Sequence, residues 1–226
     1  MTAGVPKGLG RFVEDGGQEA RAAPPEGLRR FLERPSRPAP GERCELCAEP
    51  LSEAHAHVAN LDSRAILCTC RACYLLFTHE GAAKGRYRAV PERYRYDPGF
   101  ALTDEQWDAM QIPVRIAFLF VNSSLDRMAA FYPSPAGATE SLLPPDTWAE
   151  ILAANPAFAG IAPDVEALLV HRQPERCECY LVPIDACYQL VGLVRLHWKG
   201  FDGGQEAWRE IDAFFAGLRA RSGAHS

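Results

Sequence analysis

Four cysteines in two pairs are the residues of this sequence whose types and spacing most clearly indicate a chemical role. Cys44 and Cys47 form one C-x2-C pair, Cys70 and Cys73 form a second, and 22 residues separate the pairs. Two such pairs complete the tetrahedral shell of four thiolates that zinc takes in closed structural sites, and the spacing is near that of zinc ribbons and treble clefs. We therefore expect these four cysteines to bind a metal. Zinc is the expected ion, and iron in a rubredoxin-like site is the alternative.

A further cysteine and two histidines lie close to these pairs. Cys68 competes with Cys70 for the third ligand position, but only Cys70 has C-x2-C spacing to Cys73. His55 and His57 lie between the pairs, and on a strand they would share one face. They are candidates for a second metal or a labile position, although exposed hairpin histidines are the commoner interpretation.

A second group of potential ligands lies later in the chain. His171, Cys177 and Cys179 fall within nine residues, and Cys187 could add a fourth donor through space. Free or buried thiols are the simpler interpretation, because no companion C-x2-C pair follows. A cysteine–histidine nucleophile has no supporting sequence context.

No catalytic constellation accompanies these groups. A closed shell of four cysteines leaves no coordination position for a substrate. The P-loop, the dinucleotide-binding glycine pattern, H-E-x-x-H and G-x-S-x-G are absent from the sequence. We therefore predict no catalytic residues, and an enzyme is the less favoured class.

Residues 84–96 (KGRYRAVPERYRY) form a basic segment interleaved with tyrosines. It contains five basic residues, one acid and three tyrosines. Nucleic-acid-binding surfaces combine arginines that contact phosphates with tyrosines that stack on bases. A solvated face, or a surface for an acidic protein partner, is the commoner use of such a charge run.

Composition and charge narrow the class of protein. A hydrophobic content of 47% and a charged content of 23% are ordinary for a globular protein with its own core. The net charge of −5 argues against a surface devoted to nucleic acid or membranes. No apolar signal segment and no run of about 18 apolar residues is present, so we expect a cytoplasmic protein without a membrane helix. Thiols stay reduced there, so the eight cysteines are expected to be ligands or buried thiols.

Hydrophobic patterns predict the elements that position these residues. Residues 54–61 and 64–67 can form a hairpin between the cysteine pairs. Thr103 and Gln106 match a capping box for a helix over 104–110. The nearly continuous apolar run 114–121 predicts a central strand buried on both faces. Further strands are expected at 127–132, 139–143, 166–172 and 179–182, and further helices at 146–154, from a cap at Asp185, and after Gly203-Gly204.

The order of these elements predicts an α+β fold. A small zinc-ribbon or treble-clef-like four-cysteine module is followed by a mixed α+β domain. Residues 1–41, rich in Gly, Pro, Arg and Glu, are expected to form a flexible arm in which 26–33 can make a short helix. The module with its basic and tyrosine-rich segment would cover 42–100, and the α+β domain 101–221.

Several segments together resemble a known domain family. They are RCELCAEPL (43–51), CRACYLLF (70–77), SSLDRMAAFYPSPAGATESLLPPDTW (123–148), DVEALLV (164–170) and VPIDACYQLVGLVRLHWKGFDGG (182–204). The family occurs in high-GC bacteria, where we associate it with gene clusters for high-affinity, oxygen-tolerant NiFe hydrogenases. The resemblance spans roughly residues 25–220. It implies an accessory role in hydrogenase maturation, assembly or electron-transfer support, and it assigns no catalytic residue.

We therefore predict a non-catalytic accessory or adaptor protein with a structural zinc site. Its expected partner is a protein, with hydrogenase subunits or maturation factors as candidates. Two alternatives remain. One is a nucleic-acid-binding zinc-module regulator that uses residues 84–96, and the other is a rubredoxin-like redox protein or metallochaperone that holds iron or nickel.

Overall fold

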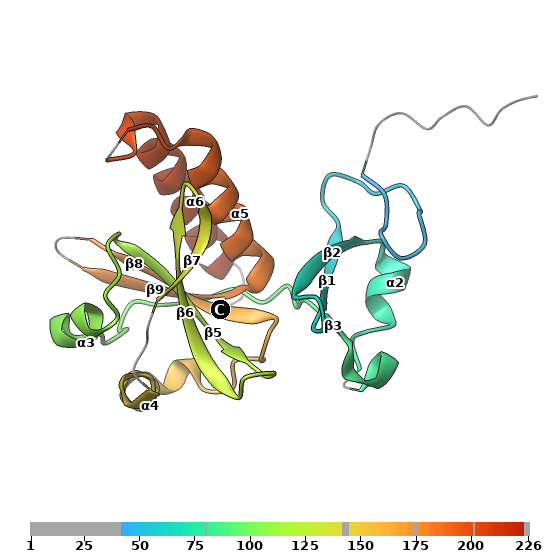
Figure 1. Cartoon of the computed structure of the whole chain (residues 1–226), viewed down its shortest axis with the longest axis horizontal. Helices are drawn as coiled ribbons and strands as arrows, with labels where there is room; N and C mark the ends of the chain where they lie inside the picture. Colours follow the sequence, from blue (N-terminus) through green and yellow to red (C-terminus); the bar gives the residue numbers. More distant parts are fainter. Residues whose placement is uncertain (1–41, 80, 142–144, 174–175, 201, 224–226) are drawn as a thin grey trace, which may run out of the picture. The chain divides into compact units, whose positions relative to one another are not determined.

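A computed structural model describes residues 42–79, 81–141, 145–173, 176–200 and 202–223. The arm expected over 1–41, with its short helix at 26–33, lies outside the described residues. Residues 41–226 form one compact unit. Its strands make two sheets, and every described strand pairing is antiparallel (Figure 1).

The smaller sheet carries the cysteine module. Strands β1 (Ala56–Asn60) and β2 (Ala65–Thr69) form the hairpin expected between the cysteine pairs, and β3 (Tyr87–Ala89) pairs with the other edge of β1. Helix α2 (Arg71–Leu75) follows β2 directly, and the short 3-10 helix η1 (Ala82–Gly85) precedes β3. The hairpin closes because the Asn60 side chain accepts hydrogen bonds from two backbone N–H groups of the turn, at 3.1 and 3.2 Å.

The larger sheet has six strands in the order β4-β9-β8-β5-β6-β7. The strands predicted over 114–121, 127–132, 139–143, 166–172 and 179–182 are all present, with ends shifted by a few residues. Residues 95–97 add an edge strand. The bounds are β4 (Arg95–Asp97), β5 (Ile116–Asn122), β6 (Arg127–Ser134), β7 (Gly137–Ser141), β8 (Glu166–Arg172) and β9 (Cys177–Pro183).

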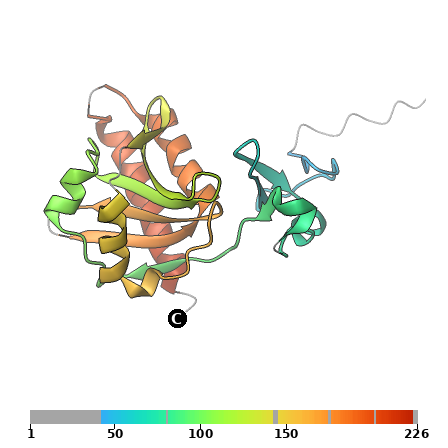
Figure 2. The same cartoon turned by 60° about the horizontal axis from the view of Figure 1, so that its bottom comes forward.

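Helices cover both faces of this sheet, as both views show (Figure 1, Figure 2). Alternate residues of β5 enter two separate cores, so Ile116 and Phe118 pack beneath α5 (Ile184–His197) and α6 (Gly204–Gly223). Ala117 and Leu119 pack with residues of α3 (Asp104–Ala109) and α4 (Pro145–Ala154), near the 3-10 helix η2 (Pro156–Phe158). The prediction of a central strand buried on both faces is confirmed, and so is the α+β class.

A local sequence signal sets the start of α3 but not that of α5. The Thr103 hydroxyl accepts from the Gln106 N–H at 3.2 Å, and the Gln106 side chain accepts from the Thr103 N–H at 3.0 Å, so the capping box is confirmed. The prediction that Asp185 caps a helix is wrong. Helix α5 begins at Ile184 after Pro183, and Asp185 lies inside its first turn. None of the described helices is both long enough and apolar enough to span a membrane.

Candidate metal centre

The two C-x2-C pairs converge on one point of the module. The Sγ atoms of Cys44, Cys47, Cys70 and Cys73 all lie within 4.8 Å of one another, and those of Cys47 and Cys70 are 3.7 Å apart. Cys44 and Cys73 are buried, whereas Cys47 is exposed. None of the eight cysteines forms a disulfide. Four free thiols at this separation are the donor set that a tetrahedral thiophilic metal requires, so the cluster could hold a metal ion.

A tight turn positions the first pair. The Ala48 N–H donates to the Cys44 carbonyl at 2.7 Å, and the Cys44 N–H donates to the Glu49 carbonyl at 2.8 Å. Ala48 adopts a left-handed conformation with φ of 63°, which lets the chain reverse directly after Cys47. Glycine is the usual residue for this conformation, so the knuckle forms here at some cost in backbone strain.

The start of α2 positions the second pair. Cys70 is the N-cap residue of this helix, and its Sγ accepts from the Cys73 N–H at 3.5 Å. A sulfur at this position takes the place of the oxygen of an ordinary capping side chain. The first turn of the helix then brings Cys73 to the same side as Cys70.

The pKa values of the clustered thiols diverge. Burial raises the pKa of Cys44, but hydrogen bonds from the backbone of Cys70, Leu46 and Cys47 outweigh it and bring that pKa to about 6. Burial, together with the neighbouring thiols, raises the pKa of Cys73 to about 12. One thiolate therefore forms readily, while further ionisation is opposed by charge already present. A bound divalent cation offsets that repulsion, which is why metal binding and thiol deprotonation are linked.

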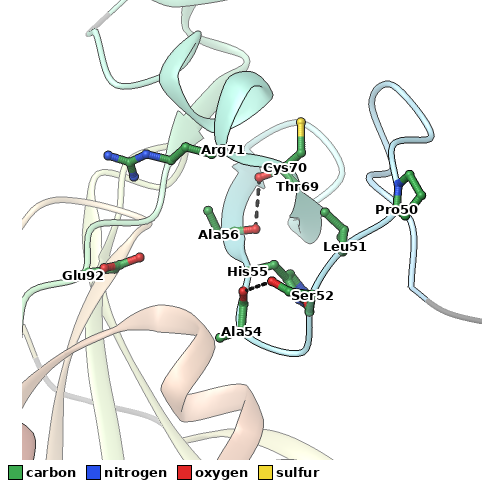
Figure 3. Close-up of a pocket in the computed structure, with 10 residues that line it drawn as sticks. All are labelled: Pro50, Leu51, Ser52, Ala54, His55, Ala56, Thr69, Cys70, Arg71 and Glu92. Carbon is green, nitrogen blue, oxygen red and sulfur yellow. Dashed lines mark hydrogen bonds between the residues drawn. The ribbon is translucent and has the colours of Figure 1, made fainter.

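Cys68 lies away from this cluster. It is the direct partner of His57 across the β1–β2 ladder, and its sulfur lies within 4.8 Å of ligand atoms of both His55 and His57. In Figure 3 the sulfur of Cys70 points away from His55. The structure thus separates two groups, with Cys70 in the four-cysteine cluster and Cys68 beside the histidines.

The later group of potential ligands is not brought together. His171 pairs with Glu178 across the β8–β9 ladder, so the two residues share a face, while Cys177 and Cys179 point to the opposite face. The His171 ring stacks on Phe215 of α6 with centroids 4.1 Å apart, and burial lowers its pKa. Sequence reasoning missed Glu178, a buried carboxylate that forms an ion pair with Arg176 at 3.1 Å and accepts a hydrogen bond from Arg219. Glu178 pairs with His171 on the neighbouring strand and contacts Arg219 on α6, so no local sequence motif predicts these contacts.

The basic segment 84–96 is largely engaged within the molecule. Arg86 pairs with Asp62 at 2.7 Å, Arg88 donates to the Pro163 carbonyl at 2.8 Å, and Arg93 binds Glu166. Tyr96 stacks on Tyr180, with centroids 4.9 Å apart. These contacts reduce the positive charge free to meet phosphates. Nucleic-acid binding stays a prediction.

Fold and site together define the class: an α+β protein with a four-cysteine cluster that could hold a metal. Residues 43–222 match the model described as "Family of unknown function (DUF5947)". The chain therefore belongs to this family. No curated protein and no solved structure matches it. The expectation of a family without an assigned activity is confirmed, and the association with hydrogenase gene clusters stays a prediction.

Proposed function

We propose that this protein is a non-catalytic accessory protein in which Cys44, Cys47, Cys70 and Cys73 bind a structural zinc ion. The observation that supports this most is the convergence of four free thiols within 4.8 Å. Four protein sulfurs fill a tetrahedral shell and leave no position for a substrate. Iron fits the same donor set and is the alternative ion.

The metal would stabilise the module by linking the two ends of its hairpin. The first cysteine pair precedes β1 and the second follows β2, so a shared ion would join the two ends of the hairpin, which the β1–β2 ladder and the Glu45 N–H to Cys68 carbonyl hydrogen bond already hold near each other. The small sheet contributes few buried apolar side chains, among them Val58, Ala59 and Ala89. Small modules with so little core depend on their metal for folding.

Exposed leucines beside the cysteines support a protein-binding role. Leu46 is 37% exposed within the first knuckle, and Leu75 and Leu76, at the end of α2, are 52% and 65% exposed. Large apolar side chains exposed within one small module can contribute to an interaction site. Hydrogenase subunits and maturation factors are the first partners to test, because of the sequence resemblance described above.

Metal analysis of the untagged protein tests the first part of this proposal. Zinc without visible colour supports it, whereas red, iron-type absorbance contradicts it. Cys47→Ser is expected to lose this zinc and to unfold the module. Cys177→Ser, the same thiol-to-hydroxyl change in the large sheet, is the matched control and should keep both. An unchanged melting temperature in the Cys47→Ser variant would sink the structural role.

Binding measurements with purified hydrogenase subunits and maturation factors test the second part. Leu76→Glu is expected to weaken binding at least tenfold, since a charge would enter the apolar surface. Leu196→Glu, at a leucine of α5 that is 74% exposed, is the control and should bind normally. Equal affinity in both variants would exclude the α2 leucines as the docking surface.

A further inference from the structure

One face of the small sheet gathers a second set of side chains that could bind a metal. His57 and Cys68 are directly opposite each other on β1 and β2, and His55 precedes His57 by two residues. Directly opposed residues, and residues two apart on an extended strand, share a face. One ligand atom from each of His55, His57 and Cys68 lies within 4.8 Å of the other two.

Both histidine rings are held through the same nitrogen. His55 Nδ1 lies 3.0 Å from the Ser52 carbonyl oxygen, and His57 Nδ1 lies 2.6 Å from an Asp185 carboxylate oxygen. A carbonyl oxygen can only accept a hydrogen bond, so this contact requires the proton on Nδ1, and in the neutral ring the lone pair available to a metal is then on Nε2. Metal-binding histidines are oriented by this kind of contact to a carbonyl or carboxylate.

The second ring nitrogen of His55, Nε2, is available to bind a metal. The His55 side chain is 9% exposed, and its Nε2 is buried without a hydrogen-bond partner among the described residues. A buried polar atom left unpaired costs free energy, and such atoms in folded proteins usually have an explanation. A metal ion bound between the rings and Cys68 supplies the missing partner.

We propose that His55, His57 and Cys68 form a second zinc site with Asp185 as the residue that orients His57. Two neutral imidazoles and one thiolate leave a net charge of +1 on the bound ion, which the Asp185 carboxylate offsets. Three protein ligands leave the fourth tetrahedral position open, unlike the closed four-cysteine shell. All three ligands line a cavity of about 1200 Å³, so a water molecule or a small anionic ligand can reach that position.

The site is independent of the proposed structural zinc, because the two ligand sets share no residue. His55 also contributes to a smaller cavity of about 370 Å³, drawn in Figure 3 with Cys70 on its wall. The Cys68 N–H donates to the Glu45 side chain at 2.6 Å, and a Glu42 carboxylate oxygen lies 3.6 Å from His55 Nδ1. These acids add negative potential that favours a cation on this side of the module.

Metal titration of the full chain tests the proposal. The protein stripped of metal is expected to bind two zinc ions, and cobalt(II) should report two tetrahedral sites with different numbers of thiolate ligands. His57→Gln and Cys68→Ser are expected to bind one ion and to keep the spectrum of the four-cysteine site. His79→Gln, at an exposed histidine of the same module, is the matched control and should still bind two.

Asp185→Asn separates orientation of the ligand from loss of the ligand. It should keep both ions at saturation and weaken the second by about 10- to 100-fold, as such orienting contacts usually do. Binding of one ion by the unaltered protein, with the four-cysteine spectrum intact, would overturn the second site and leave the structural zinc untouched. Loss of both ions in the Cys68→Ser variant, while His57→Gln keeps two, would place Cys68 in the four-cysteine site and also overturn it.

Discussion

Replacing Arg93 by alanine should destabilise the protein strongly, although Arg93 lies in a segment that resembles a nucleic-acid surface. Glu166, at the start of β8, has a side chain with no exposed surface. Its carboxylate accepts from Arg93 Nε at 2.7 Å, from Arg93 Nη2 at 2.5 Å, and from the Ala162 N–H at 2.8 Å. The Arg93→Ala change removes two of these three donors and the only ion-pair partner found for Glu166 among the described residues.

The expected loss of stability follows from the difference in burial between the two partners, since Glu166 is fully buried and Arg93 is partly exposed. Breaking a buried ion pair by deleting one partner costs about 3–5 kcal/mol, because the remaining charge stays buried without compensation. Arg93 is 45% exposed, so its removal admits some water to the carboxylate, and we expect about 3 kcal/mol. For a domain of this size that corresponds to a fall in Tm of about 6–12 °C.

Urea denaturation of the zinc-loaded protein, with Arg93→Ala and Glu166→Gln compared singly and combined, is the assay. Glu166→Gln should cost less than Arg93→Ala, because the partly exposed guanidinium can be solvated when its partner loses charge. The double variant should be more stable than Arg93→Ala alone, since no charge is then left buried. A loss below about 1 kcal/mol in Arg93→Ala would refute the reasoning, because exposed ion pairs already contribute that much.

Three further changes test other parts of the structure. Ala48→Gly should raise the stability of the zinc-loaded protein by about 0.5 kcal/mol, since glycine relieves the left-handed strain but costs chain entropy; a lower Tm would contradict this. Thr103→Ala should lower the free energy of unfolding by about 1 kcal/mol through loss of the capping box, as measured by denaturation. Burial lowers the pKa of His171, so the unfolded chain takes up a proton first as pH falls below about 6.5, and stability drops. His171→Gln should therefore show a smaller loss of stability between pH 7 and pH 5, and an equal loss would show that His171 does not contribute. Glu178 and Asp212 raise the pKa of His171, whereas Arg176 and Arg115 lower it. The difference in stability loss between the two proteins therefore depends on the sum of these opposing charges.

Local sequence signals were sufficient to predict most of the helices and strands and each of the two C-x2-C pairs. Each C-x2-C pair lies within one turn or one helix start, so its two sulfurs are brought together by backbone geometry over a few residues. The capping box at Thr103 is likewise complete within four residues. The run at 114–121 predicted a central strand because an unbroken apolar pattern is stable only where both faces are covered.

Tertiary structure decided how distant segments meet. The register of β1 against β2 places Cys68 opposite His57, and a shift of one residue would turn Cys68 to the other face. The register of β8 against β9 similarly separates His171 from Cys179, although the sequence brings them within nine residues. The local sequence around Asp185 indicates a helix cap. Its contact with His57 joins segments far apart in the chain, so no local pattern predicts it.

The sequence by itself therefore predicted most of the strands and helices, the α+β class and the two C-x2-C pairs. Only the tertiary structure assigned Cys68 to the histidines, paired Arg93 with Glu166 and buried Glu178. The physical reason is range: backbone hydrogen bonding and hydrophobic periodicity act over a few residues. The pairing of ligands and charges depends on strand register and helix packing, which no short segment specifies.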